Sequence, residues 1–127
     1  QLRKLDGWTK RRRAIADRFN RELIGVCTPP VSRQAFHVYH QYTVRVPNRD
    51  AVQKSLAAAD VPTAVHYPMA IHEQPIVREK LGAHPAAALP ETAKAAREVM
   101  SLPMHPYLDA STQEKVVDAL ARALASL

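Results

Sequence analysis

Apolar residues recur every three or four positions over the first 24 residues of the chain. At 3.6 residues per turn such positions share one face, so this stretch predicts a single amphipathic helix. The apolar positions are Leu2, Leu5, Trp8, Ile15, Phe19 and Leu23. No capping residue precedes them, which predicts that the sequence begins inside an element. Gly25 is expected to end the helix, and residues 28–30 (Thr-Pro-Pro) to form a turn.

The pattern then changes to strict alternation between Phe36 and Val46, which predicts the longest strand of the chain. One face is mainly apolar and the other is mixed. The first face carries Phe36, Val38, His40, Tyr42, Val44 and Val46, and the second carries His37, Tyr39, Gln41, Thr43 and Arg45. On this pattern we expect His40 to be a core histidine that is satisfied by a buried hydrogen-bond partner.

The rest of the chain predicts alternating helices and short strands. Asn48 can cap a helix whose inward residues are Ala51, Val52, Leu56 and Ala59. The elements expected after it are a strand at 61–66, an irregular stretch at 69–89 with a helical piece at 75–81, a helix from Pro90 to Met100, a short extended segment at 101–104, and a last helix opened by a capping box at 111–114. This order predicts a single α/β domain with helices packed on a three-stranded sheet.

Composition places the chain among ordinary globular domains. It has 127 residues, of which 46% are hydrophobic and 24% charged, and it lacks an apolar run long enough for a membrane helix. Cys27 is the only cysteine, so an internal disulfide is excluded and a cytoplasmic location is expected.

The net charge of +6 comes entirely from the first 33 residues, which hold nine Lys/Arg and three Asp/Glu. Most of these cations belong to the basic run, which we define as Lys10, Arg11, Arg12, Arg13, Arg18 and Arg21. A solvated or subunit-facing helix surface explains such a stripe. Two other functions remain open: a non-enzymatic module that binds a protein partner through this helix, and a nucleic-acid binder that uses the same stripe.

Several kinds of chemistry are disfavoured by the spacing of the candidate residues. His37 and His40 would point to opposite faces of the predicted strand, and His66 and His72 could converge only through a loop, so no metal site is expected. No Gly-x-Ser-x-Gly elbow and no glycine-rich phosphate loop is present.

Two proline-bounded segments remain as candidates for a site. In Val61–Pro68 a β-branched run ends in His66 and Tyr67, and Pro68 stops the strand. Ser101–Leu108 repeats the order of apolar run, histidine and proline. His66 and Tyr67 could bind a ligand, or could pack locally with His66 satisfied by a backbone carbonyl. His105 and Tyr107 are expected to be structural.

At these segments the chain resembles the C-terminal domain of the DegT/DnrJ/StrS sugar aminotransferases. The resemblance rests on Leu-x-x-Leu-x-x-Trp and Arg-Arg-x-x-Ala within 2–23, His-Val-Tyr-His-Gln-Tyr at 37–42, the segment 63–68, Ile-His-x-Gln-Pro at 71–75, and 102–107. The segments follow the family's order and span nearly the whole chain. Among family branches, the chain is most similar to the one that makes 3-amino sugars for bacterial surface polysaccharides.

The resemblance implies a small C-terminal domain (1–127) of a fold-type I, pyridoxal-phosphate-dependent transferase, with residues 1–24 leading to a larger domain that is absent here. It implies that the larger domain holds the cofactor and the Schiff-base lysine, that the enzyme is a homodimer, and that an amino group passes, with glutamate as donor, to a nucleotide-linked ketosugar. Carried over by position, His66 and Tyr67 match the pair that contacts the sugar-nucleotide substrate. The resemblance implies no catalytic, cofactor-binding or metal-binding residue in this chain.

The chain differs from the family pattern at Ala70, and it contains no lysine that matches the family's Schiff-base lysine. Ala70 stands where a second proline is common, two residues after His-Tyr-Pro. None of the lysines has a context like that of the Schiff-base lysine; they are Lys4, Lys10, Lys54, Lys80, Lys94 and Lys115.

Overall fold

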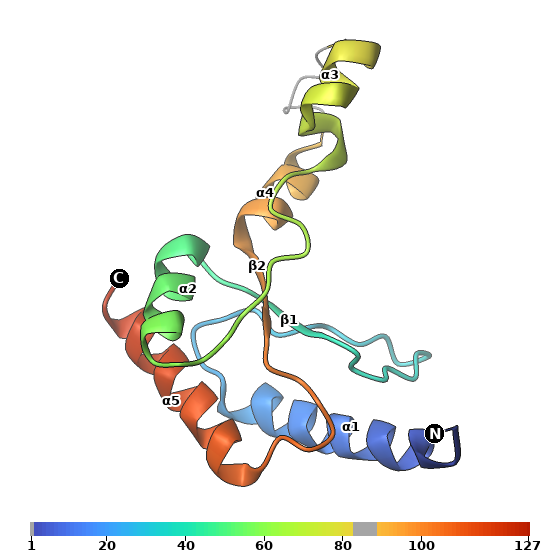
Figure 1. Ribbon diagram of the computed structural model, residues 1–127, viewed down its shortest axis with the longest axis vertical. Helices are drawn as coiled ribbons and strands as arrows, with labels where there is room; N and C mark the ends of the chain where they lie inside the picture. The colour runs from blue at the N-terminus through green and yellow to red at the C-terminus, as the bar shows by residue number, and fades with distance from the viewer. Residues whose placement is uncertain (1, 83–88) are drawn as a thin grey trace.

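The structure is a computed structural model that describes residues 2–82 and 89–127 (Figure 1). Its helices and strands follow the expected order, except that the strand expected at 61–66 does not form. They are α1 (Leu5–Glu22), β1 (Tyr42–Arg45), α2 (Arg49–Ala58), α3 (Pro75–Leu81), α4 (Pro90–Glu98), β2 (Val99–Leu102) and α5 (Ala110–Ala125), with short 3-10 turns η1 (Leu2–Lys4) and η2 (Ile71–Glu73). The prediction of a helical piece at 75–81 is confirmed at both ends. Part of the irregular stretch predicted at 69–89 lies outside the described residues.

Within the described residues the sheet has two antiparallel strands, so the expected three-stranded sheet is not found. In the register, Tyr42 faces Leu102 and Arg45 faces Val99. The segment predicted as the third strand meets β2 only at Ala64, which exchanges two backbone hydrogen bonds with Ser101. Pro62 and Pro68 have no backbone N–H to donate, so they cannot extend this pairing. On the other edge, Cys27 forms a similar single bridge with Arg45.

The strand predicted at 36–46 is wrong over its first half, because only residues 42–45 pair with a neighbour. Tyr39 has a φ of 47°, in the left-handed region, which interrupts the extended backbone. The His37 side chain also competes with a strand partner, since its Nδ1 accepts a hydrogen bond from the Tyr39 backbone N–H at 2.9 Å. Local side-chain bonding therefore turns residues 36–41 into a loop.

Helices α1, α2 and α5 cover one face of the sheet and form the core with it (Figure 1). Fully buried side chains come from each of these elements: Phe19, Tyr42, Val44, Val52, Leu56, Met100, Val116 and Leu120. Tyr42 packs edge-on against Phe19, with ring centroids 5.2 Å apart, and its hydroxyl donates to Asn20 at 2.7 Å. Burial, and secondarily the nearby Tyr39, raises the pKa of Tyr42, so its hydroxyl stays protonated as a donor.

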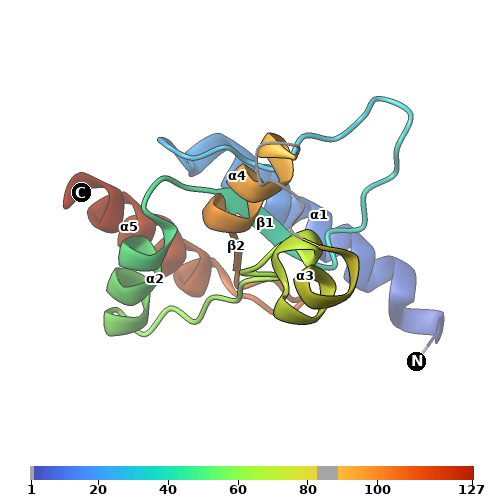
Figure 2. The same ribbon diagram turned by 90° about the horizontal axis from the view of Figure 1, so that it is seen from above.

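Two parts of the chain extend away from this core. The segment with α3 projects to one end of the molecule beyond α4 (Figure 1), and the connection between α1 and β1 leaves the body as a wide loop (Figure 2). The projecting segment exposes large apolar side chains, among them Tyr67, Met69, Ile71 and Ile76.

The helix starts differ from prediction in their capping residues. Asn48 occupies the N-cap position of α2, but its backbone is left-handed and its side chain caps nothing. Val52 and Leu56 face inward as expected, whereas Ala51 is exposed. The predicted capping box at 111–114 is wrong, because α5 begins at Ala110 and its N-cap is Asp109. The Asp109 Oδ1 accepts from the Thr112 backbone N–H at 2.7 Å and from the Ser111 hydroxyl at 2.8 Å.

These hydrogen bonds predict an acid dependence of stability. The Thr112 backbone N–H, followed by side-chain hydrogen bonds, lowers the pKa of Asp109 below its ordinary value of 3.8. The unfolded chain therefore binds more protons in this range. The contribution of Asp109 is fully present above about pH 4 and is lost as pH falls through the lowered pKa. Urea midpoints measured between pH 2 and 6 should show a smaller acid loss for Asp109→Ala than for the wild type.

In residues 2–82 and 89–127, no helix combines the length and the hydropathy needed to cross a bilayer.

Candidate functional site

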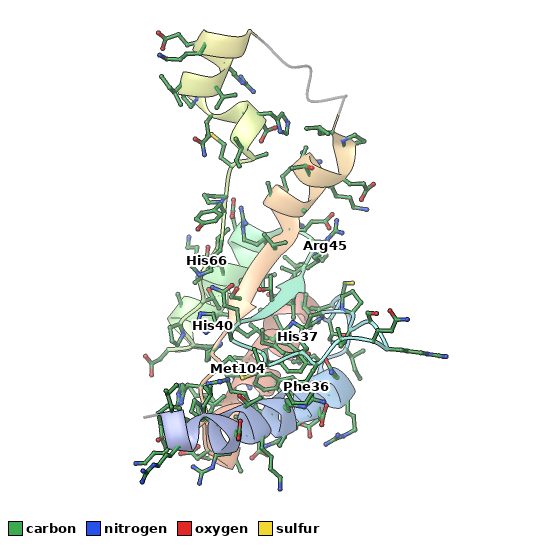
Figure 3. All side chains as sticks on the ribbon, turned by 90° about the vertical axis from the view of Figure 1, so that its right-hand side faces the viewer. Phe36, His37, His40, Arg45, His66 and Met104 are labelled. Carbon is green, nitrogen blue, oxygen red and sulfur yellow. The ribbon has the colours of Figure 1, made fainter. Side chains whose placement is uncertain are left out.

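A cleft of about 270 Å³ lies against the sheet face that the core helices leave open. Its wall brings together the two proline-bounded segments that sequence analysis singled out. The lining residues are His40, Gln41, Pro62, Thr63, Ala64, His66, Ser101, Leu102, Pro103 and Met104. In Figure 3 the labelled side chains of His66 and His40 lie along the same side of the sheet, with Met104 below them. We call this hollow the His66 cleft.

Backbone pairing sets the position of the segment that carries His66. Ala64 donates its N–H to the Ser101 carbonyl at 3.1 Å and accepts the Ser101 N–H at 2.7 Å. The backbone N–H and C=O of Ser101 both bond Ala64, so they do not bond Thr43, the residue opposite Ser101 on β1. Thr43 and Ser101 are therefore a non-hydrogen-bonded pair of the antiparallel sheet, in which the side chains lie close together. The two side chains meet there, with the hydroxyl oxygens 2.9 Å apart. The pairing of Ala64 with Ser101 of β2 thus sets the position of His66, which follows Ala64 by two residues.

A second cleft of about 450 Å³ adjoins the first, and we call it the Phe36 cleft. It is lined by Pro29, Phe36, His37, Val38, His40, Gln41 and Thr43. His40 and Gln41 belong to both linings, so they form a shared wall. The Thr43–Ser101 hydrogen bond joins a lining residue of one cleft to a lining residue of the other. The two clefts therefore lie next to each other on this face, and we call them together the tract.

The structure corrects two expectations about histidines. His40 is exposed and lines both clefts, so the core interpretation was wrong; its premise was the strand face that the loop at 36–41 abolishes. His37 and His40 were expected on opposite faces, yet both line the Phe36 cleft. In the described part of the chain, no group of three or more His, Cys, Asp or Glu side chains gathers as a metal site requires.

His66 and Tyr67 lie in different surroundings. His66 lines the His66 cleft, whereas Tyr67 is outside its lining and is 76% exposed. Their rings meet edge-on, with centroids 5.9 Å apart, and the peptide bond between them is cis. Both side chains are open to solvent, so both are available to a ligand.

Sequence reasoning gave no site role to three residues of the tract: Phe36, Gln41 and Thr43. Ser101 belonged to a candidate segment, and it is the only polar residue in the apolar run 99–102. Gln41 and Thr43 were on the more polar face of the alternating pattern. Phe36 had been placed on the inward face, and only the loop conformation reveals its exposure.

Part of the basic run is used inside the fold. Arg12 Nε donates to the Val38 carbonyl at 3.2 Å, and Arg13 Nη1 donates to the His37 carbonyl at 2.8 Å. Arg18 pairs with Glu22 and also donates to the Ala110 carbonyl. These three guanidinium groups tie α1 to the loop and to α5. That use weakens the case for a free basic stripe that would bind nucleic acid.

The second proline-bounded segment continues into contacts that hold the chain together. His105 Nδ1 accepts from the Tyr107 N–H at 3.3 Å, and the Leu108 N–H donates to the His105 carbonyl. The Tyr107 hydroxyl accepts from Trp8 Nε1 at 2.8 Å, which ties this turn to α1. These bonds agree with the structural roles expected for His105 and Tyr107.

The lysines of this chain do not fit a pyridoxal-phosphate site. All six are exposed: Lys4, Lys10, Lys54, Lys80, Lys94 and Lys115. Lys115 bonds the Asp60 carboxylate and carbonyl, and none of the six lines either cleft. A Schiff-base lysine must face the cleft in which the cofactor is held, and none of these exposed side chains does so.

Comparison with known proteins identifies the class. Residues 1–121 match the model of the DegT/DnrJ/EryC1/StrS aminotransferase family. The chain belongs to this family, which depends on pyridoxal phosphate.

Individual relatives agree with this assignment. The UDP-2-acetamido-2-deoxy-3-oxo-D-glucuronate aminotransferase of Pseudomonas aeruginosa is 50% identical over 97 residues, which cover 76% of this chain and 26% of that protein. The crystal structure of S. venezuelae DesV superposes with a TM-score of 0.87 at 33% identity, covering 95% of this chain and 33% of DesV. NtdA from Bacillus subtilis, solved with bound cofactor PMP, gives 0.77 at 26% identity, covering 93% of this chain and 28% of NtdA. This chain spans a third or less of the length of each.

Proposed function

We propose that this chain is the C-terminal domain of a pyridoxal-phosphate-dependent aminotransferase that aminates a nucleotide-linked ketosugar. The observation that carries the proposal is the cleft lined by His66, formed by two segments that also carry the family likeness. The 50% identity to the P. aeruginosa enzyme supports it. In this proposal the part of the relatives outside the matched third holds the cofactor, and residues 1–24 lead to that part.

The domain contributes binding and orientation rather than bond-making. Pyridoxal phosphate, when bound, supplies the electron sink for transamination. The imidazole of His66 and the phenol of Tyr67 can each donate and accept hydrogen bonds, which suits a sugar with several hydroxyl groups. The lining of the cleft mixes polar with apolar side chains, which suits a sugar ring with both hydroxyl groups and C–H surfaces.

Three finer features belong to the same proposal. The name of the P. aeruginosa relative specifies a 3-oxo sugar, which supports amination at C3. A role in surface polysaccharide synthesis is proposed with it. Glutamate is the proposed amino donor. A cytoplasmic homodimer is proposed as the working form, since the exposed apolar side chains of the α3 segment suit burial in a larger assembly.

Replacing His66 and Tyr67 in the intact enzyme tests the assignment. His66→Ala is expected to raise KM for the nucleotide sugar about tenfold, because a cleft hydrogen bond to substrate is worth about 1 to 1.5 kcal/mol. Tyr67→Phe should have a smaller effect in the same direction. Steady-state kinetics would measure both, while the absorbance change with glutamate alone should proceed as in the wild type.

The matched control is His105→Ala, which removes an exposed imidazole outside both clefts. It should leave KM within about twofold of the wild type. Unchanged kinetics in both His66→Ala and Tyr67→Phe would contradict the substrate role. A loss of the reaction with glutamate alone would instead place these residues at the cofactor.

A further inference from the structure

Phe36 is an exposed aromatic side chain that the fold holds in place. It is 72% exposed at the rim of the Phe36 cleft, on the loop between α1 and β1 (Figure 3). The Arg13 guanidinium lies over the ring, 4.3 Å from its centroid. Arg13 also bonds the carbonyl of the next residue, His37, and Arg12 bonds the carbonyl of Val38. Two arginines of α1 therefore hold the loop at the two residues that follow Phe36.

Such an anchored ring is suited to stacking. One face is covered by the cation, and the high exposure leaves the rest of the ring to solvent. An exposed phenylalanine gains nothing from burial, but it offers a flat apolar surface to a heterocyclic base at low entropic cost. The chemistry of the surroundings decides which side of the ring a ligand would take.

The two sides of Phe36 differ in their carboxylates. The groove between the loop and α1 is lined by Asp6 and Asp17, whose charges are balanced by Lys10 and Arg13. Among the described residues that line the Phe36 cleft, none carries a carboxylate, and two carry imidazoles. A phosphorylated ligand would therefore meet no carboxylate in the Phe36 cleft and would find hydrogen-bond donors there.

His37 has its donor fixed by a backbone contact. Because its Nδ1 accepts the Tyr39 N–H at 2.9 Å, the neutral ring must carry its proton on Nε2. This leaves an N–H that can donate to a phosphate oxygen. His40, on the wall shared with the His66 cleft, provides a second imidazole between the two hollows.

From this arrangement we infer that the Phe36 cleft binds the nucleoside diphosphate part of the substrate. The base stacks on Phe36, the diphosphate passes the imidazoles of His37 and His40, and the sugar reaches the His66 cleft. The inference rests on the proposed function, since it assumes that the His66 cleft receives the sugar. It adds a specificity role for residues that the family likeness leaves unassigned.

The test compares nucleotide binding by wild-type and variant intact enzymes. UDP and dTDP are titrated by calorimetry, and inorganic pyrophosphate serves as a probe without a base. Phe36→Ala should weaken the tighter-binding nucleotide about tenfold or more, because a stacked base is typically worth that much on removal of the aromatic ring. Pyrophosphate binding should stay unchanged, and Phe36→Tyr, which keeps the stacking surface, should restore nucleotide binding.

Ile24→Ala is the matched control, since Ile24 is an 83% exposed apolar residue outside both clefts. It should bind nucleotide like the wild type. Unchanged nucleotide binding in Phe36→Ala, together with a raised KM in His66→Ala, would overturn the inference and leave the proposed function standing. If the wild type binds neither nucleotide and aminates no nucleotide sugar, both fail. Equal weakening of pyrophosphate and nucleotide by Phe36→Ala would overturn the stacking role.

Discussion

Replacing Phe19 by alanine is expected to lower the free energy of unfolding by about 3 to 5 kcal/mol, the usual cost of deleting a fully buried aromatic ring. Phe19 has no exposed surface and meets the Tyr42 ring edge-on at 5.2 Å. It lies where α1 contacts β1, so the cavity would open between a helix and the sheet. Because the Tyr42 hydroxyl is bonded to Asn20 on the same helix, the sheet cannot move to fill that space without breaking this bond.

Urea unfolding of the 127-residue chain, followed by far-UV circular dichroism, would measure this loss. Phe36→Ala is the matched control, because it deletes the same side chain from a 72% exposed position. It should cost no more than about 1 kcal/mol, the value of its contact with Arg13. Equal losses in the two variants would show that the core does not lie between α1 and β1.

The helices and the core were largely predictable because their signals are repeated many times. In α1 and α5 the apolar spacing runs over several turns, so a single exception such as the exposed Leu5 does not change the pattern. Prolines at 75 and 90 marked the starts of α3 and α4 correctly. Periodicity of this length averages over local irregularities, which explains the agreement.

The strands were less predictable because one hydrogen bond can redirect a short segment. The alternation from Phe36 to Val46 is real in the sequence, yet His37 and Tyr39 satisfy each other locally and only 42–45 join the sheet. Alternation describes faces, but it does not say whether a partner strand is present to take the backbone groups. The same limit explains why the segment at 61–66 pairs only at Ala64.

For the candidate site, the two segments named from the sequence both line the His66 cleft, but other lining residues were not named. The proline-bounded ends at 61–68 and 101–108 could be read directly, and the structure brings them together through Ala64 and Ser101. The place of His40 on the wall shared by the two clefts could not be predicted from the sequence, because it depends on the conformation of the loop at 36–41. The basic run agrees in part with the expected helix surface, since Lys10, Arg11 and Arg21 are exposed, whereas Arg12 and Arg13 bind backbone carbonyls that the sequence did not indicate.

Arg49 links the site to the projecting segment in a way that no sequence pattern indicated. It is the first residue of α2, where a cation is unfavourable to the helix dipole, yet it is only 7% exposed. Its Nη1 donates to the carbonyls of Ala96 at 3.2 Å and Val99 at 3.1 Å, and its Nε pairs with Asp50. The two carbonyls lie at the junction of α4 and β2. A cation there satisfies carbonyls that the helix end leaves without partners.

Arg49→Ala is therefore expected to lower the free energy of unfolding by about 3 kcal/mol, because it removes charged hydrogen bonds and leaves two carbonyls short of partners. Arg49→Lys keeps the charge but replaces a planar fork by a single ammonium, so it should recover about half of the loss. Urea unfolding would measure both, and hydrogen exchange should show faster opening at the α4–β2 junction.

Arg97→Ala, which removes an exposed guanidinium from α4, should change stability by less than about 0.5 kcal/mol. If Arg97→Ala matches Arg49→Ala, surface charge rather than the buried bonds stabilises this junction. Since β2 continues from the junction to Ser101, its loosening in Arg49→Ala should also raise KM for the nucleotide sugar without affecting the reaction with glutamate alone.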